Sequence, residues 1–504
     1  MALAVVAIAL WAARPYAVGV YHDDGVYVIL AKALATGQGY RFLHLPGAPV
    51  AAHYPPGYPL VLALLWRIVP RFPANVMLFL FANAVFTGIA AWYTQRFARR
   101  VLGWGAAAAA AAALIATATF PMLLLSGLVL SEPLFAACLL PALIAGERLV
   151  APSNDAPAGG RRALAVGLAA GALALVRTHG LAFELAVVAL LALRRRWRDA
   201  ALCVAGAAIV IVPWSLWVGH RATPLPPGLE GSYGSYLGWF LAGLRATGVH
   251  GVVSTVTTNV REVGELLADR WSLADAAVVR HATALLAAAA LVAGLWRMAR
   301  RAPVTAAFVA IYLLVMLAWP FTPWRFLYAV WPLIVLCMGA AVAWGARLPA
   351  RAARSAVVAA TAVLLLGMAR AEVRSDAARS WRSGAANATA AIGPLVRWVS
   401  SNTSPSDVVA VDGEQLVYLF TGRTAVPIVP FTAAEYVTPR TTAMNAASIA
   451  QLLRAVPVNY LVTIAPPLRD AARLVAQRDT TAGAPRLRAL GAVGAGEAFR
   501  VQNR

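Results

Sequence analysis

Long apolar stretches, separated by short arginine-rich clusters, are the feature that most limits how this chain can fold. A helix needs roughly 17–25 mostly apolar residues to cross a bilayer, because its backbone polar groups find no water there. Roughly eleven stretches reach or approach this length. They lie at about 2–20, 74–93, 105–127, 129–146, 163–178, 180–193, 200–218, 281–296, 304–320, 326–345 and 355–370. We therefore expect a polytopic α-helical membrane protein.

The composition excludes a soluble enzyme. Of the 504 residues, 61% are hydrophobic and only 13% are charged, whereas soluble domains carry about 25% charged residues. The formal net charge is +22. The basic residues lie in short clusters between apolar stretches and form no basic domain, so we expect the lipid bilayer and not nucleic acid as a partner.

The arginine clusters predict the orientation of the chain, because basic residues of short loops stay on the cytoplasmic side of a membrane. The clusters follow the even-numbered stretches and comprise Arg96/Arg99/Arg100, Arg148/Arg161/Arg162, Arg194/Arg195/Arg196/Arg198, Arg297/Arg300/Arg301 and Arg347/Arg351/Arg354. We therefore expect a cytoplasmic N-terminus and an extracytoplasmic C-terminal part. A signal peptide is the alternative for the first stretch, which Arg14 and Pro15 interrupt, but no charged segment precedes it.

The predicted topology gives a membrane domain over residues 1–370, with long outer loops at 21–73 and 219–280. After residue 370 the pattern changes to short β-rich runs at 407–411 and 460–464, with helical patterns near 412–421 and 447–455. This alternation predicts a small C-terminal extracytoplasmic α/β domain over 371–504.

Two adjacent acidic residues, Asp23 and Asp24, stand at the start of the first outer loop. Apolar residues then recur with helical spacing from Val26 to Leu34, which predicts a short amphipathic helix at the membrane surface. One aspartate is enough to cap such a helix. We therefore expect at least one of the pair to act as a general base or a metal ligand, with capping alone as the alternative.

The same loop contains a proline-rich segment at 53–59. It reads His53-Tyr54-Pro55-Pro56-Gly57-Tyr58-Pro59. The prolines argue against a helix and favour a stiff loop. His53 is a candidate donor to a phosphate, or else a residue that stacks within the loop. Tyr54 and Tyr58 are candidate substrate contacts.

Four further polar side chains lie at predicted outer helix ends. Glu132, in Ser131-Glu132-Pro133, is a candidate site residue, although this pattern also suits the start of a helix. Arg325 and Arg177 are candidate phosphate ligands, because a guanidinium presents forked donors to an oxyanion. Anchoring at the membrane interface is the alternative for both. His179 follows Arg177 closely and has the same two interpretations.

Together these motifs resemble the GT-C glycosyltransferases. The likeness rests on the Asp-Asp pair, the Tyr-Pro-Pro-Gly loop, a Ser-Glu-Pro-Leu-Phe helix start, an Arg-x-x-Gly turn and an Arg-Phe-Leu-Tyr-x-x-Trp-Pro segment. Within that fold the motifs are most similar to the glycosyltransferase family 39-like group, which includes protein O-mannosyltransferases and aminoarabinose transferases. The likeness covers about residues 15–345.

The resemblance implies transfer of a sugar from a polyprenyl-phosphate donor to a lipid, glycan or protein acceptor. The reaction would take place on the outer face of a bacterial inner or plasma membrane, with inversion at the anomeric carbon. Asp23 would deprotonate the acceptor, Asp24 would support the geometry or a cation, and Glu132 would be the acid of the second outer loop. Arg325 and Arg177 would hold the donor phosphate.

Two departures from the family pattern bear on these roles. Relatives often have lysine near the position of His53, and many read Arg-Pro-Glu-Gly where this chain has Arg177-Thr178-His179-Gly180. The second change removes a carboxylate from that turn. We therefore leave open a divalent metal at Asp23 and Glu132, and the resemblance implies no other cofactor.

Two other functions compete with this interpretation. A transporter or flippase of lipid-linked sugars would also use buried acids and basic phosphate anchors. However, transporters place their sites near the bilayer midplane between inverted repeats, and we find no repeat here. A non-catalytic assembly subunit would not need vicinal acids, a proline-rich loop and a second acid at one membrane depth.

Overall fold

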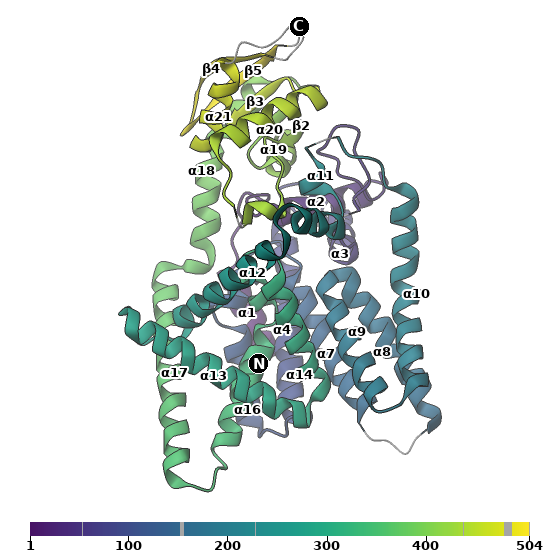
Figure 1. Cartoon of the computed structure of the whole chain (residues 1–504), viewed down its shortest axis with the longest axis vertical. Helices are drawn as coiled ribbons and strands as arrows, with labels where there is room; N and C mark the ends of the chain where they lie inside the picture. Colours follow the sequence, from purple (N-terminus) through teal and green to yellow (C-terminus); the bar gives the residue numbers. More distant parts are fainter. Residues whose placement is uncertain (53, 152–155, 227, 437, 478–485, 503–504) are drawn as a thin grey trace. The chain divides into compact units, whose positions relative to one another are not determined.

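The computed structural model describes residues 1–52, 54–151, 156–226, 228–436, 438–477 and 486–502. The chain forms two compact units, each assembled from segments that are far apart in the sequence (Figure 1). The first unit comprises Met1–Arg14, Leu80–Ser215 and Thr255–Ser383, and the second comprises Pro15–Phe79, Leu216–Ser254 and Gly384–Arg504.

The first unit consists of helices. They are α1 (Ala2–Ala12), α4 (Val76–Arg100), α5 (Ala106–Thr117), α6 (Phe120–Ser126), α7 (Glu132–Val150), α8 (Ala156–Val176), the short η1 (Thr178–Gly180), α9 (Leu181–Leu193), α10 (Trp197–Arg221), α12 (Tyr236–Trp271), α13 (Ala277–Arg301), α14 (Pro303–Ala318), α15 (Trp324–Ala329), α16 (Trp331–Gly345) and α17 (Arg351–Ala378). Helices α4, α10, α12 and α18 (Ser380–Asn402) each contain a boundary between the two units.

Most predicted apolar stretches coincide with helices or with pairs of successive helices, but the stretch at 2–20 is helical only over Ala2–Ala12. In the described part of the chain, five helices are long and apolar enough to cross a membrane, and six if α5 and α6 form one bent span. The others include Ala2–Ala12, Pro303–Ala318 and Trp331–Gly345, which are apolar but only 10–17 residues long. The polytopic helical fold is therefore confirmed, whereas the number of eleven spans stays a prediction.

Small residues let the apolar helices approach closely, as is typical of membrane helix interfaces. Helix α13 packs against α16, and a Cβ atom added at Gly294 would lie 1.8 Å from the carbonyl oxygen of Cys337. At the crossing of α8 and α10, a Cβ atom at Gly206 would lie 2.4 Å from the carbonyl oxygen of Leu164. Only glycine fits at these two crossings.

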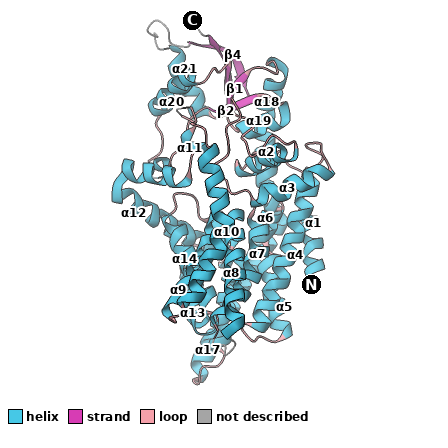
Figure 2. Cartoon of the chain, turned by 90° about the vertical axis from the view of Figure 1, so that its right-hand side faces the viewer, coloured by secondary structure: helices cyan, strands magenta, loops and turns pink. Residues whose placement is uncertain are grey.

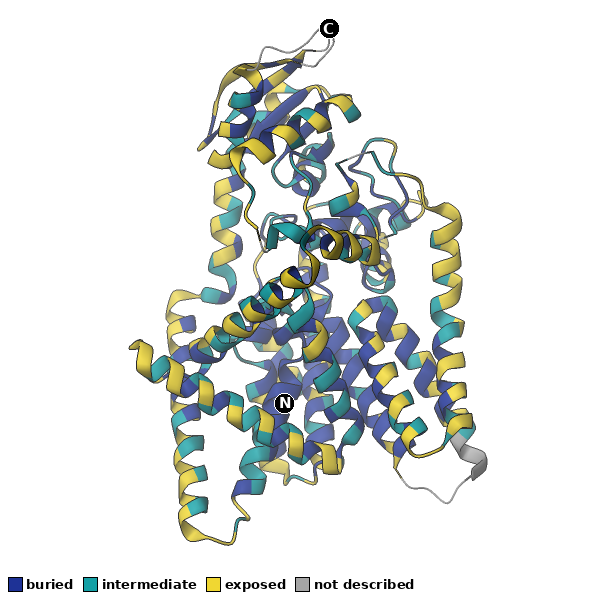
Figure 3. Cartoon of the chain, in the orientation of Figure 1, coloured by how far each residue is buried: buried dark blue, intermediate teal, exposed yellow. Residues whose placement is uncertain are grey.

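Apolar side chains also cover the exposed sides of several helices. Figure 3 shows exposed residues along α10, α13 and α17, the helices that carry Ile209, Leu285 and Val358. Exposed apolar surface of this extent is unfavourable in water. These faces are suited to contact with lipid chains.

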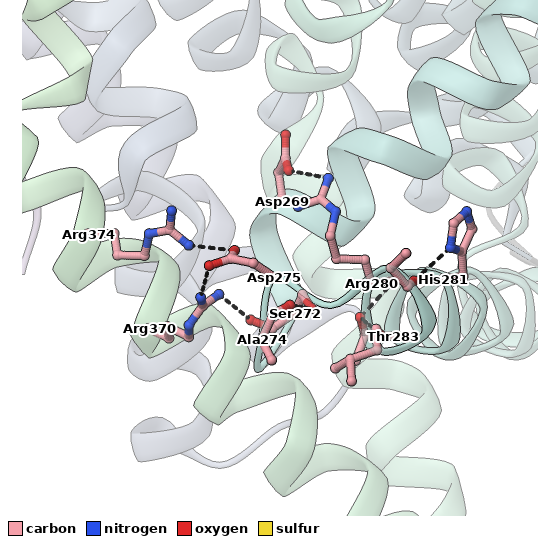
Figure 4. Close-up of polar contacts among 11 residues, drawn as sticks. Asp269, Ser272, Ala274, Asp275, Arg280, His281, Thr283, Arg370 and Arg374 are labelled. Carbon is pink, nitrogen blue, oxygen red and sulfur yellow. Dashed lines mark hydrogen bonds and ion pairs between the residues drawn. The ribbon is translucent and has the colours of Figure 1, made fainter.

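The turn between α12 and α13 is linked to α17 by charged side chains (Figure 4). Asp275 accepts hydrogen bonds from Arg370 at 2.7 Å and Arg374 at 2.8 Å, and these two guanidinium groups lower the pKa of Asp275. Asp269 and Arg280 form a further ion pair at 2.7 Å. These exposed pairs orient the turn but contribute little to stability.

The second unit contains the segments predicted to be outer loops and a small β-sheet with helices packed on it (Figure 2). Its elements are α2 (Asp23–Ala35), α3 (Gly57–Ile68), α11 (Glu230–Tyr233), α18 (Ser380–Asn402), β1 (Val408–Val411), α19 (Glu414–Thr421), β2 (Thr424–Pro427), η2 (Ala433–Tyr436), α20 (Thr442–Ala455), β3 (Tyr460–Thr463), α21 (Pro466–Gln477), β4 (Arg486–Val493) and β5 (Gly496–Gln502). The strand order is β2-β1-β3-β5-β4. β1 is parallel to β2 and β3, whereas β5 is antiparallel to β3 and β4.

The core of this sheet joins strands and helices through buried aliphatic residues. Leu395 and Val399 of α18 pack with Val409 of β1, Leu416 of α19 and Val462 of β3. Helices α2, α19 and α20 and strands β1 and β3 are present where they were predicted, whereas the membrane-surface position expected for α2 stays a prediction. The sheet also contains β2, β4 and β5, which we did not predict. The boundary at residue 370 between two domains stays a prediction.

One sequence expectation about the proline-rich segment is wrong. We expected no helix through 53–59, but α3 begins at Gly57 and therefore includes Tyr58 and Pro59. Proline is compatible with the first turn of a helix, because the amide hydrogens there have no partner within the helix. The segment is thus a loop only up to Pro56.

Glu147 of α7 provides a test of the helix packing in the first unit. Its Oε1 accepts hydrogen bonds from Thr305 N and Thr305 Oγ1, both at 2.7 Å, at the start of α14. We expect Glu147→Ala to lower the free energy of unfolding by about 1–3 kcal/mol, because buried donors lose their acceptor. Glu147→Gln should cost less, since its amide oxygen still accepts.

The measurement is thermal or denaturant unfolding of the purified protein in detergent. Glu265→Gln on α12, an exposed position, is the control and should leave stability unchanged. Equal stability of wild type and Glu147→Ala would show that this contact does not support α14.

Candidate active site

Asp23 lies at the first position of α2, and its carboxylate is held by a tyrosine of the proline-rich loop. The hydroxyl of Tyr54 donates a hydrogen bond to Asp23 Oδ1 at 2.7 Å. Burial and the Asp23 charge raise the pKa of Tyr54 well above its usual value, so this hydroxyl keeps its proton. Tyr40 in turn donates to the carbonyl oxygen of Tyr54 at 3.0 Å. The two predicted features of the first outer loop therefore meet at Asp23.

Asp24 has different surroundings from its neighbour. It is fully buried, and its carboxylate accepts hydrogen bonds from the backbone N–H groups of Gly19 at 2.9 Å, Tyr21 at 3.1 Å and Gly25 at 2.9 Å. Burial raises the pKa of Asp24, although these hydrogen bonds oppose that effect. The contacts of Asp24 hold the backbone on both sides of Asp23.

Aromatic rings support this arrangement. Tyr27 of α2 makes edge contacts with Tyr54 at 5.6 Å and with Tyr58 at 5.1 Å between ring centroids. Tyr58 is fully buried, so its contacts are those of a core residue. His53, which we predicted to donate a hydrogen bond to a phosphate, lies outside the described residues.

A buried polar cluster next to α2 was missing from our sequence predictions. The hydroxyl of Tyr233 in α11 donates to Glu414 Oε1 at 2.5 Å and lies 2.9 Å from His44 Nε2. Gln415 Nε2 donates to Tyr233 Oη at 2.6 Å and lies 2.8 Å from His22 Nδ1. Only His22, beside the aspartate pair, carried a local signal, because the other members are distant in sequence.

The first unit contains a second charged cluster, which brings together three predicted site residues. Glu132 is fully buried at the start of α7. Its Oε1 accepts from Arg325 Nε at 3.0 Å and Arg325 Nη2 at 2.8 Å, and it lies 2.9 Å from Arg177 Nη1. Arg177 Nη1 also donates to Ser131 Oγ at 3.0 Å. Two guanidinium groups around one carboxylate leave this cluster with a formal charge of +1.

His179 lies beside this cluster, among aromatic rings. Its ring centroid is 5.0 Å from that of Phe326 and 5.6 Å from that of Tyr312. Phe326 also lies 5.8 Å from the guanidinium carbon of Arg177. Arg177, His179, Arg325 and Glu132 therefore belong to one region of the first unit.

The structure thus places the predicted residues in two groups, one in each unit. Asp23, Asp24, Tyr54 and Tyr58 lie in the second unit, and the group around Glu132 lies in the first. Across the described ranges, no group of three or more His, Cys, Asp or Glu side chains could hold a metal ion. The two arginines on Glu132 also disfavour a cation at that carboxylate.

Comparisons with known proteins identify the fold. No protein-family model and no curated protein sequence matches the chain. Among solved structures, it is similar to ArnT from Cupriavidus metallidurans bound to undecaprenyl phosphate, with 15% identity, a TM-score of 0.56 and coverage of 99% of this chain and 96% of ArnT. The chain has the fold of a GT-C glycosyltransferase. The GT-C expectation from the sequence motifs is therefore confirmed.

A second group of similar structures is the oligosaccharyltransferase AglB from Archaeoglobus fulgidus. The structure of AglB with an inhibitory peptide and a dolichol-phosphate has 14% identity and a TM-score of 0.50, and the match covers 100% of this chain and 74% of AglB. Another AglB structure, tethered to an acceptor peptide, has a TM-score of 0.53. At these identities the likeness establishes the GT-C fold.

The Glu132 cluster predicts a strong dependence of stability on the shared carboxylate. Removal of one partner from a buried ion pair costs about 3–5 kcal/mol, because a charge stays buried without compensation. We expect Glu132→Gln to destabilise the protein by roughly 3 kcal/mol. The double variant with Arg325→Gln should lose less than the sum of the single effects. Additive losses, measured by unfolding in detergent, would contradict this coupling.

His44 predicts a pH dependence of stability. Burial, with a smaller contribution from His22, holds the pKa of His44 well below its usual 6.5. The folded state therefore favours the neutral ring, and the stability that His44 contributes above pH 6.5 is lost as the pH falls below that value.

The test compares thermal unfolding of wild type and His44→Gln at neutral pH and at pH 5. Wild type should lose more stability on acidification than the variant, which has no ring to protonate. The same acid sensitivity in both proteins would show that another group is responsible.

Proposed function

We propose that this protein is a membrane glycosyltransferase that moves a sugar from a polyprenyl-phosphate donor to an acceptor hydroxyl. The observation that carries the proposal is the match of 99% of the chain to 96% of ArnT, a transferase whose structure holds undecaprenyl phosphate. The similar AglB structure holds a dolichol-phosphate. Within this fold, the chain has a tyrosine-oriented carboxylate at Asp23 and a cationic cluster at Arg177 and Arg325.

In this proposal Asp23 is the general base. Its carboxylate removes the proton from the acceptor hydroxyl as the acceptor oxygen forms a bond to the anomeric carbon. The bond from that carbon to the phosphate oxygen breaks, polyprenyl phosphate leaves, and the anomeric configuration is inverted. The hydrogen bond from Tyr54 fixes one carboxylate oxygen, so that the base stays oriented.

Arg325 and Arg177 serve the leaving phosphate in the same proposal. Negative charge grows on the phosphate oxygens as the sugar leaves, and positioned guanidinium groups stabilise it. Glu132 orients both arginines through its Oε1 and leaves the cluster with a net positive charge. No step requires a metal ion.

The arginine clusters and the apolar helices support the proposed setting. We place the reaction on the extracytoplasmic face of a bacterial inner or plasma membrane, with the N-terminus in the cytoplasm and the α/β sheet outside. A donor whose lipid tail stays in the bilayer presents its sugar phosphate at that face. The acceptor is a hydroxyl of a lipid, a glycan or a protein.

The proposal is tested with purified protein in nanodiscs and a panel of polyprenyl-phosphate sugars, each with candidate acceptors. We expect release of polyprenyl phosphate together with glycosylated acceptor. Asp23→Asn should lower kcat by roughly 100-fold or more, because the variant has no base. The anomeric configuration of the product, read by NMR, tests inversion.

Asp470→Asn is the matched control, since Asp470 is exposed on α21 and pairs with Arg469 at the surface. It should retain full activity. Equal turnover in wild type and Asp23→Asn would remove Asp23 as the base. Movement of intact donor across the bilayer without any transfer would favour a flippase instead.

A further inference from the structure

The residue before the predicted base has an unusual backbone conformation. His22 has φ 62° and ψ −68°, and the Asp23 N–H donates to the Tyr21 carbonyl oxygen at 2.7 Å. These values define a γ-turn of the rare, strained kind. A side chain other than glycine at positive φ is costly, and such strain persists only where the surrounding structure enforces it. The position of Asp23 follows directly from this turn.

The backbone on both sides of the turn is fixed by Asp24. Its carboxylate accepts from Gly19 N and Tyr21 N before the turn and from Gly25 N after it. The main chain cannot relax at either end without losing hydrogen bonds to a buried acceptor. Asp24 does not hold the side chain of His22, which lies at the centre of the turn.

The imidazole of His22 is held by Gln415 of α19. Gln415 Nε2 lies 2.8 Å from His22 Nδ1, within hydrogen-bond distance. The two segments are also tightly packed. A Cβ atom added at Gly25 would lie 2.6 Å from Gln415 Cβ, and one at Gly19 would lie 2.6 Å from Leu416 Cβ.

Gln415 is itself immobilised. It is fully buried, and its amide nitrogen lies 2.6 Å from Tyr233 Oη and 3.0 Å from Glu414 Oε1. Tyr233 is fixed by its donation to Glu414 and by His44. These short contacts limit the movement of the Gln415 amide nitrogen. The amide therefore forms a fixed support for the His22 ring.

We propose that His22 and Gln415 form a clamp that keeps the γ-turn strained and thereby aims the carboxylate of Asp23 at the acceptor. Gln415 is a positioning residue in this proposal, since it acts on Asp23 through His22. The inference rests on the proposed function of Asp23 as the base. It adds that the α/β sheet region, through α19, takes part in setting the catalytic geometry.

The test uses Gln415→Leu, which keeps the approximate volume and removes the donor, and His22→Ala, which removes the ring. Misplacement of a catalytic group by about 1 Å can cost on the order of 100-fold in rate. We expect either change to lower kcat by roughly 10- to 100-fold per folded molecule. The KM for the donor should stay within about twofold, because the groups proposed to bind the phosphate are untouched.

A double variant separates positioning from general damage. If both residues act through one contact, His22→Ala combined with Gln415→Leu should be no slower than the slower single variant. Gln451→Leu, at an exposed glutamine of α20, is the matched control and should keep wild-type kcat. Multiplied losses in the double variant, or an unchanged kcat in either single variant, would overturn the clamp.

A readout without turnover tests the clamp separately from the proposed function. In ¹⁵N-histidine spectra of the full-length protein, with the His22 signal assigned by its loss in His22→Ala, wild type should show a hydrogen-bonded His22 Nδ1. Gln415→Leu should change this signal, and His22→Gly should melt at a higher temperature than His22→Ala, because glycine relieves the positive φ.

These outcomes distinguish the two proposals. Absence of transfer in wild type would defeat the proposed function, and the spectra and melting temperatures would still decide whether the clamp exists. The clamp alone would be wrong if wild type is active but its His22 signal does not change in Gln415→Leu. It would also be wrong if His22→Gly and His22→Ala melt at the same temperature.

Discussion

A polar group inside hydrocarbon must find its partner within the protein, and this constraint shapes the whole chain. It confines the first unit to helices, whose backbones satisfy themselves, and lets glycines such as Gly294 bring these helices into contact. It also concentrates charge at helix ends. Where a carboxylate is nevertheless buried, as at Glu132 or Glu147, donors from other helices surround it. Polar chemistry is therefore scarce in this protein, and each instance is informative.

The same constraint explains what the sequence could predict. Apolar length predicts helices well, because a spanning segment has few alternatives, and the stretches at 74–93 and 281–296 became α4 and α13. Short strands are harder to predict. β1 and β3 carry β-branched residues, whereas β4 begins with Arg-Leu-Arg-Ala, of which only Leu487 is buried, and it pairs with β5. The helix at Gly57 was missed because prolines were read as breakers, although a first turn accepts them.

Within the candidate site, local motifs were predictable and long-range partners were not. The pairing of Glu132 with Arg325 joins residues 193 apart in the chain, and each was a candidate because charge is unusual at its position. Tyr233, Glu414 and Gln415 lie in segments where polar residues are ordinary, so nothing marked them. Only folding shows that they converge beside His22.

The contact between His22 and Gln415 spans 393 residues. Each residue proposed to meet donor or acceptor precedes Phe326, so a ribosome produces all of them long before it reaches α19. On the clamp proposal, an unfinished chain already contains all the residues proposed to react, but the carboxylate of Asp23 is not yet oriented toward the acceptor. Full activity would then appear only when synthesis is nearly complete. A chain cut short before α19 would keep these groups but, on the clamp proposal, transfer sugar roughly 10- to 100-fold more slowly.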